Sequence, residues 1–304
     1  MKTTSILCVA IFLSGCVLDS EDTDLLKNLN FSSESIAACV SKSADAKGYN
    51  SVLDVQVLSC GEDVGVFDQA ALNELNIFTN LTTLRLGWSS SLVEFDGKAF
   101  PFLTEFRCDD CGIFSLDISQ NPELKSLEIW GNKYLENLDF SNNPKLSKLQ
   151  LSDVSILNLI LGQQNNLTEI YLVGNYSHET FINLDFTEAT ALERVEMRYI
   201  GANYLDLSQN INLTYLLVSG IYIEDIDMNT SKLRELSITN SAIVTFDISE
   251  FTELVAVVLY GNNIVNVNLD YNQKLELANF ENNPLSTDMI EYLESLTRID
   301  RVVF

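Results

Sequence analysis

Three stretches of the chain repeat the same alternation of apolar and polar residues. Leu116–Ile129 reads LDISQNPELKSLEI, Leu138–Leu151 reads LDFSNNPKLSKLQL, and Leu205–Val218 reads LDLSQNINLTYLLV. The apolar positions stay fixed while most of the polar residues between them vary. Apolar side chains at fixed spacing indicate a shared core, and variable polar positions indicate surface. The pattern therefore predicts repeating structural units rather than one closed globular domain.

The repeat runs through most of the chain at a nearly constant length. Its first leucines are spaced by 20 to 25 residues, most often by 21. They are Leu81, Leu103, Leu124, Leu146, Leu167, Leu192, Leu213, Leu233, Leu254 and Leu275. Each unit opens with L-x-x-L-x-L, in which the second and third apolar letters alternate as in a strand with one buried face. One such unit cannot bury its apolar face alone, so we expect the units to stack into a solenoid with a parallel sheet.

This pattern resembles the leucine-rich repeat, L-x-x-L-x-L-x-x-N, in the short 21-residue form of internalin-like bacterial proteins. Four residues match the turn asparagine of that motif: Asn132, Asn175, Asn262 and Asn283. We expect these amides to bond neighbouring turn backbone. Three apolar residues interrupt the ladder in the middle repeats: Val154, Ile200 and Ile221. The resemblance covers about residues 53 to 296 and implies an arc-shaped solenoid, with its sheet on the concave face and short irregular segments on the convex side.

The two ends of the repeat array carry a different pattern, as a solenoid needs covers for its terminal core. Residues 32–48 predict a helix with Ser32 or Ser33 as N-cap, and Val52–Ser59 alternates as a strand. Residues 286–296 predict an amphipathic helix, and residues 298–304 a short closing strand. The first of these units resembles the N-terminal caps of bacterial repeat proteins, which implies a disulfide between Cys39 and Cys60.

The first sixteen residues are typical of an export signal. Lys2 precedes the apolar run Ile6–Leu13, which is too short to cross a bilayer as a helix. The sequence LSGC that follows resembles the lipobox of bacterial lipoproteins, which implies lipid attachment at Cys16 and anchoring by several acyl chains. Val17 follows the cysteine where the family's inner-membrane retention signal is aspartate, which favours the outer membrane. The alternative is an ordinary signal peptide with a chance cysteine.

The expected organisation is therefore a signal peptide at 1–15, an acidic tether at 16–31, a cap at 32–80, repeats at 81–283 and a second cap at 284–304. The formal charge of −25 excludes nucleic acid as a natural partner, because phosphate binding needs clustered Lys and Arg. The lone histidine, His178, and the absence of a glycine-rich phosphate loop argue against an enzyme. We expect no catalytic residue, metal or cofactor.

Two polar features have more than one interpretation. Cys108 and Cys111 (CDDC) form either a local disulfide or a pair of buried thiols, because a single histidine makes a zinc site improbable. Seven aspartates recur at one position of the repeat: Asp96, Asp117, Asp139, Asp185, Asp206, Asp227 and Asp247. A calcium ladder is one interpretation, but one carboxylate per coil supplies too few oxygens. Local hydrogen bonds to the following backbone are the preferred interpretation.

The outward positions of the predicted strands carry the residue types that anchor protein interfaces. Both tryptophans and five of the seven arginines lie there, and tyrosines and aliphatic residues gather over repeats five to nine as one expected apolar patch. The candidate ligand-binding residues are Trp88, Trp130, Tyr171, Val173, Arg194, Arg198, Tyr199, Tyr215, Leu217, Val258 and Tyr260. Exposed strands favour aromatic residues in any case, which is the competing explanation.

The sequence thus predicts a monomeric, membrane-anchored, non-enzymatic module that holds a protein or peptide on the concave face of a leucine-rich repeat solenoid. The alternative is a structural protein of the cell envelope that binds itself or a cell-wall polymer. The identity of the ligand does not follow from the sequence.

Overall fold

The computed structural model describes residues 26–304 except 62–64, 66–67, 89–90, 175–183, 203, 222, 224 and 229–231. The expected signal peptide, the lipidation residue Cys16, the turn residue Asn175 and His178 lie outside the described residues. Within the described part of the chain, no helix is long and apolar enough to cross a membrane.

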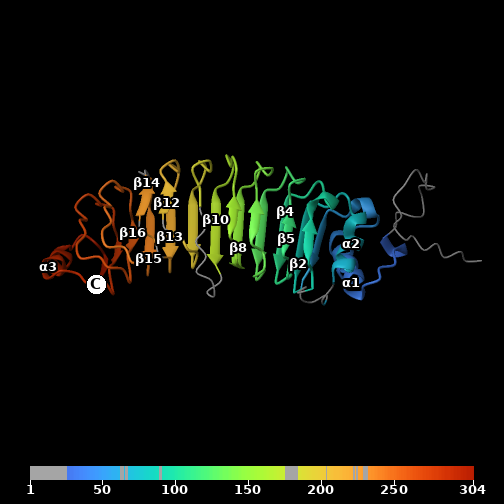
Figure 1. The fold of residues 1–304 in the computed structure, drawn as a ribbon, viewed down its shortest axis with the longest axis horizontal. Helices are drawn as coiled ribbons and strands as arrows, with labels where there is room; N and C mark the ends of the chain where they lie inside the picture. Colours follow the sequence, from blue (N-terminus) through green and yellow to red (C-terminus); the bar gives the residue numbers. More distant parts are fainter. Residues whose placement is uncertain are drawn as a thin grey trace, which may run out of the picture.

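The molecule is a solenoid built on one parallel sheet of twelve strands, which lie side by side along the long axis and point the same way (Figure 1). In sheet order they are β1 (Val57–Cys60), β2 (Thr83–Gly87), β4 (Glu105–Asp109), β6 (Ser126–Trp130), β8 (Lys148–Val154), β10 (Glu169–Gly174), β11 (Arg194–Arg198), β13 (Tyr215–Ser219), β15 (Glu235–Thr239), β16 (Ala256–Val258), β17 (Leu277–Asn279) and β18 (Arg301–Val303). The repeats therefore stack in sequence order, as predicted.

The second half of each coil is short and partly irregular. It contributes three separate two-stranded pairs: β3 (Glu94–Asp96) with β5 (Ser115–Asp117), β7 (Asn137–Asp139) with β9 (Asn158–Ile160), and β12 (Tyr204–Leu207) with β14 (Asp225–Met228). A short 3-10 helix, η5 (Gly97–Ala99), follows β3. Between the two sides, the repeated leucines form one continuous core; the first leucine of each repeat is at most 2% exposed.

The N-terminal cap begins with η1 (Leu26–Asn28) and α1 (Glu34–Lys47), whose N-cap is Ser33. The predicted strand at Val52–Ser59 is wrong in its first half, because residues 52–54 form the 3-10 helix η2 and only β1 joins the sheet. A capping box between Ser51 and Asp54 stabilises that helix. The predicted disulfide Cys39–Cys60 is confirmed and ties α1 to β1. The helices α2 (Gln69–Glu74) and η4 (Leu75–Ile77) lead into the first repeat.

The C-terminal cap consists of α3 (Thr287–Ser295) and the final strand β18. Ser286 caps α3 by accepting the backbone N–H of Met289. Met289 and Leu293 are buried against the last coil, so the amphipathic stripe predicted for this helix covers the end of the core. The caps lie at opposite ends of the solenoid (Figure 1).

Two ladders of amides satisfy the backbone of the turns. The predicted ladder is confirmed at Asn132, Asn262 and Asn283, whose Nδ2 groups donate to carbonyls of the preceding coil and of their own turn. A second ladder was not predicted. It lies three residues before the first leucine of a repeat and consists of Asn121, Asn143, Gln164, Asn210 and Asn272.

Each member of this second ladder is fully buried. Asn143 is representative, because its Nδ2 donates to Ile118 O and to Asn121 O, both at 2.9 Å. The same position in other coils is filled by Phe78, Phe100 and Phe251, which are also buried. Ala189 occupies the position in one further coil, so the coil interior at this point accepts a large apolar ring, a small apolar side chain or a planar amide that links two coils.

The recurring aspartates make the local hydrogen bonds that were the preferred interpretation. Asp117 Oδ1 accepts the backbone N–H of Ser119 at 2.9 Å, and the same bond to the residue two positions on is made at Asp96, Asp139, Asp185, Asp206 and Asp247. The pKa of Asp117 and of Asp185 is lowered first by a hydrogen bond from the hydroxyl of the residue two positions on and then by its backbone N–H; for Asp247 the backbone N–H is the larger cause. Among the described residues, no group of three or more His, Cys, Asp or Glu is placed to hold a metal ion.

A column of left-handed residues lies at the ends of most strands of the sheet. Seven positions after the first leucine, nine of the ten repeats have a positive φ: Trp88, Asp110, Gly131, Asp153, Tyr199, Gly220, Asn240, Gly261 and Asn282. A Cβ on Gly220 would lie 2.6 Å from the Tyr199 ring, and one on Gly261 would overlap the amide oxygen of Asn240. Glycine is thus required where the previous coil places a side chain over this position.

Candidate binding surface

The outward side of the twelve-stranded sheet, called the sheet face below, is the concave side in this fold. The pairing of the strands confirms the predicted register. The central outward column runs Arg85, Arg107, Glu128, Gln150, Tyr171, Glu196, Leu217, Ser237, Val258 and Asn279. Side chains of consecutive strands therefore meet as neighbours about 4.8 Å apart along the solenoid.

The sheet face has two differently composed parts. We call the face of β2, β4, β6 and β8 the paired half, and the face of β10, β11, β13, β15 and β16 the tyrosine half.

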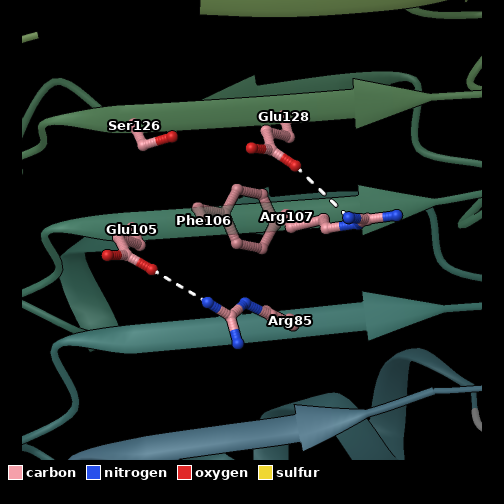
Figure 2. A pocket seen from close by; sticks show the side chains of 6 residues that line it. All are labelled: Arg85, Glu105, Phe106, Arg107, Ser126 and Glu128. Atoms are coloured by element: carbon pink, nitrogen blue, oxygen red, sulfur yellow. Dashed lines mark hydrogen bonds and ion pairs between the residues drawn. The ribbon is translucent and has the colours of Figure 1, made fainter. Parts of the chain in front are cut away.

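The paired half contains a hollow of about 250 Å³, lined by Arg85, Glu105, Phe106, Arg107, Ser126 and Glu128 (Figure 2). Arg85 binds Glu105 across the β2–β4 boundary at 3.2 Å, and Arg107 binds Glu128 across the β4–β6 boundary at 3.4 Å. Both arginines and both carboxylates are drawn into ion pairs, so the hollow offers charged hydrogen-bonding groups that are already satisfied.

Arg107 is the centre of the paired half. Its guanidinium also contacts Asp109 at 2.7 Å and lies over the Trp130 ring, with 4.4 Å from Cζ to the ring centroid. The hydrogen bond to Asp109 is the largest cause of the raised pKa of Arg107. Lys148 completes the network by binding Glu128 at 3.2 Å. The predicted ligand residue Trp130 is thus outward and 38% exposed, with Arg107 lying over its ring.

The tyrosine half is organised around a buried carboxylate on β11. Glu196 is only 8% exposed; it accepts a hydrogen bond from Arg198 Nε at 2.8 Å and forms a longer ion pair with Arg194 at 3.6 Å. The hydrogen bond with Glu196 raises the pKa of Arg198. Arg194 in turn stacks on Tyr215, with Cζ 3.4 Å from the ring centroid. Partial burial is the main cause of the raised pKa of Tyr215.

The expectation of one contiguous apolar patch is wrong, although its residues do lie on this half. Arg194, Glu196 and Arg198 on β11 stand between the Tyr171–Val173 pair and the Tyr215–Leu217 pair. A second polar strand, β15, separates Leu217 from Val258. The cause is that the outward residue at a given position differs from strand to strand. Apolar residues on two strands therefore do not touch when the strand between them carries polar residues.

The remaining predicted residues lie at the strand ends. Trp88 and Tyr199 both have positive φ, and Trp88 is 52% exposed at the N-terminal end of the sheet face. Tyr260 follows the last residues of β16 and is half-buried. The residues Tyr171, Val173, Tyr215, Leu217 and Val258 are also half-buried. These side chains contact their neighbours on the face and still present part of their surface.

One exposed aromatic pair was missed by the sequence reasoning. The rings of Phe114 and Tyr134 stack with centroids 4.6 Å apart, half a coil away from the sheet, and both side chains are about half exposed. Val93 and Leu157 are exposed in the same region of the coils. The only sequence signal was an aromatic residue in the second half of two consecutive repeats, where the spacing is irregular.

The open question about the CDDC sequence is answered by a bond between Cys108 and Cys111, with S–S 2.02 Å. Both residues are fully buried beneath the paired half. The bond lies within one coil, at the end of β4, and it fixes the turn that presents Asp109 to Arg107.

Scans against protein-family models and curated proteins found no match. Among solved structures, the functional domain of InlJ from Listeria monocytogenes is similar with a TM-score of 0.62 and 20% sequence identity, over 83% of this chain and 60% of that one. The chain thus spans less than two thirds of the InlJ domain. The internalin InlF from the same species gives 0.55 and 17%, over 88% and 95% of the two chains.

A structure of the LRIM1/APL1C complex is similar at a TM-score of 0.53 and 17% identity, over 81% of this chain and 52% of that one. At such low identities the similarity concerns the fold alone. The chain folds as a leucine-rich repeat solenoid, and the solved structures similar to it include bacterial internalins.

Proposed function

We propose that this chain is a non-enzymatic binding module that holds a protein partner on its sheet face. The observation that carries the proposal is the cluster of Tyr171, Arg194, Glu196, Arg198 and Tyr215 on three adjacent strands. Tyrosine and arginine are enriched among residues that dominate binding energy in protein interfaces. The ion pairs and the Tyr215 stack hold the two arginines in place, which reduces the entropy lost on binding.

The proposal is tested by crosslinked pull-down from native envelopes, using the wild-type chain and the double variant Tyr171→Ala, Tyr215→Ala as bait. Neither side chain enters the core, so the variant keeps its far-UV circular dichroism and its melting temperature within a few degrees. One buried tyrosine anchor is worth about 2 kcal/mol, which is roughly thirtyfold in affinity. We therefore expect capture to fall at least about tenfold.

Trp88→Ala is the matched control, because it removes an exposed aromatic residue from the opposite end of the same face. It should weaken capture much less than the double tyrosine variant. Equal capture by wild type and folded tyrosine variant would place the partner elsewhere on the molecule.

We further propose that the module is attached to the bacterial envelope, with the outer membrane favoured, through lipid on Cys16. The support is the LSGC sequence after a short apolar run. Cys16→Ser should abolish incorporation of labelled fatty acid and release the protein from the membrane fraction. A Cys16→Ser protein that sediments with membranes like wild type would remove this part of the proposal.

The second candidate is a structural protein that assembles with itself. The exposed stack of Phe114 on Tyr134 favours it, because aromatic side chains grouped on a surface often mark a contact between proteins. Sedimentation velocity separates the two functions. Concentration-dependent association that disappears in Phe114→Ser, Tyr134→Ser would support self-assembly, whereas a monomer at all concentrations leaves partner binding on the sheet face.

A further inference from the structure

The lysine and arginine side chains of strands β1 to β17 on the sheet face are engaged within the molecule. Each has a carboxylate within 4.0 Å, and they are Arg85, Arg107, Lys148, Arg194 and Arg198. Arg301 on β18, at the C-terminal end of the sheet, is exposed and lies outside this set. A partner that offered carboxylates would have to compete with these existing ion pairs. It would also approach a molecule whose formal charge is −25, which repels acidic partners at long range.

Two carboxylates of the tyrosine half differ from the rest of the face. Glu169 on β10 and Glu235 on β15 are exposed and form no ion pair with any residue that the structure describes. They lie in one row of register neighbours that runs Lys148, Glu169, Arg194, Tyr215, Glu235 and Ala256, in which Lys148 is bound to Glu128. Arg194 is adjacent to Glu169 in the register, but its guanidinium turns to Glu196 and covers Tyr215.

The charge of the whole tyrosine half remains negative. Arg194 and Arg198 share the single carboxylate of Glu196, which leaves an excess of one positive charge in that trio. Glu169 and Glu235 on either side outweigh it, so the five groups together carry a charge of −1. The complementary surface is therefore one that brings positive charge to both flanks and apolar or aromatic contact to the middle.

From this arrangement we infer that the partner presents a basic polypeptide segment, whose Lys or Arg side chains bind Glu169 and Glu235 on either side of Tyr215. This inference rests on the proposed function, and it names the chemistry of the partner for that same surface. The two glutamates are three strands apart, about 14 Å. An extended segment laid across the strands advances about 3.3 Å per residue, so basic residues at positions i and i+4 match both the distance and the side.

The test uses three synthetic peptides with capped ends and a fluorophore. The first carries lysine at positions i and i+4 around a central leucine, the second has the same composition with adjacent lysines, and the third replaces both lysines by glutamate. Binding to the intact chain is measured by fluorescence anisotropy at low and at high salt. We expect the first peptide to bind tightest, to lose affinity with salt, and the acidic peptide to bind weakest.

The variant Glu169→Gln, Glu235→Gln should weaken the first peptide at least about tenfold, because it removes both anchoring charges while keeping size and hydrogen bonding. Glu136→Gln, Glu188→Gln is the matched control, since it removes the same charge from exposed positions off the sheet face. The control should change affinity less than about threefold. Equal losses in both variants would mean that bulk charge alone attracts the peptide and would overturn the inference.

Tighter binding of the acidic peptide, or no binding of any peptide, would also overturn it. The pull-down with native envelopes distinguishes this failure from failure of the proposed function. If the tyrosine variant loses the partner and the glutamate variant retains it, the proposed binding surface stands and only its preference for basic segments is wrong. A partner retained by both variants removes the binding surface itself.

Discussion

The two halves of the sheet face are built on the same strands and coils, yet they handle charge differently. In the paired half, Arg85 and Glu105 form an ion pair in which each side chain is about half exposed. In the tyrosine half, the Glu196 side chain is only 11% exposed and forms ion pairs with both Arg194 and Arg198. The comparison teaches that outward residues alone decide whether an ion pair on this scaffold is solvated, as between Arg85 and Glu105, or held around a carboxylate that is mostly buried, as at Glu196.

The largest expected effect tests whether the coils beneath the two halves are stabilised by the same buried amide ladder. Asn143→Ala, in a coil of the paired half, and Asn210→Ala, in a coil of the tyrosine half, should each lower the free energy of unfolding by about 2–4 kcal/mol, because each removes two buried hydrogen bonds and leaves a cavity. The carbonyls keep only their backbone N–H donors. Urea denaturation measures both values.

The neighbouring exposed residues provide the controls for this prediction. Asn142→Ala and Gln209→Ala should change stability by no more than about 0.5 kcal/mol. If the Asn143→Ala variant proved as stable as the Asn142→Ala variant, the second ladder would not contribute to the stability of the fold. If the two ladder variants differed widely, the halves would differ in their interiors as well as on their face.

The next effect concerns the ion pairs themselves. Glu196→Gln should destabilise the protein by about 2 kcal/mol, less than a fully buried pair, because both arginines are more than a third exposed. Glu105→Gln, which removes the same charge from the paired half, should cost no more than about 0.5 kcal/mol. Chemical denaturation at low salt compares them. Equal costs would abolish the distinction between the halves.

The smallest effect should be the same in both halves, because the aspartate column runs through each. The pKa values of Asp117, Asp185 and Asp247 are lowered in the folded state. Their stabilisation is therefore complete above the ordinary value of 3.8 and is lost as the pH falls through the lowered folded values. Stability of wild type should decline in that window.

The triple variant Asp117→Asn, Asp185→Asn, Asp247→Asn should decline less on acidification, because an amide oxygen accepts the same backbone bond without titrating. Asn268 already does so in this column, accepting the N–H of Asp270 at 2.9 Å. Unfolding by urea at neutral and at acid pH gives the difference. Parallel pH profiles for the variant and wild type would show that these bonds do not govern acid stability.

Much of the fold was predictable from the sequence because it depends on repetition. The spacing of the leucines gave the stacking, and the alternation within L-x-x-L-x-L gave the register that β2 to β17 show. The buried ladder at Asn121, Asn143 and Asn210 was missed, since polar residues in the repeat were assigned to the surface. Asparagine is nevertheless invariant at that position in all three phrases, while the residue directly before it varies between Gln and Asn.

The binding surface was less predictable than the coils. The sequence placed Tyr171 and Tyr215 outward, but not the stack of Arg194 on Tyr215 or the burial of Glu196 between two arginines. Those arrangements depend on which rotamers neighbouring strands allow, and no periodicity encodes them. The division of the expected apolar patch needs no rotamers, because the predicted register already places Glu196 and Ser237 between the apolar residues.

The left-handed column at the strand ends bears on how a chain of this kind could lengthen or shorten. From Asp110 to Asn282 a residue with a side chain alternates with glycine in every coil, and Asp110, Tyr199 and Asn240 each lie over the glycine of the next coil. A genetic deletion of the single coil that contains Gly131 would bring Asp110 against Asp153, with no glycine between them. Gain or loss of two coils at a time would keep the alternation. Insertions and deletions in this segment are therefore expected to comprise pairs of consecutive coils.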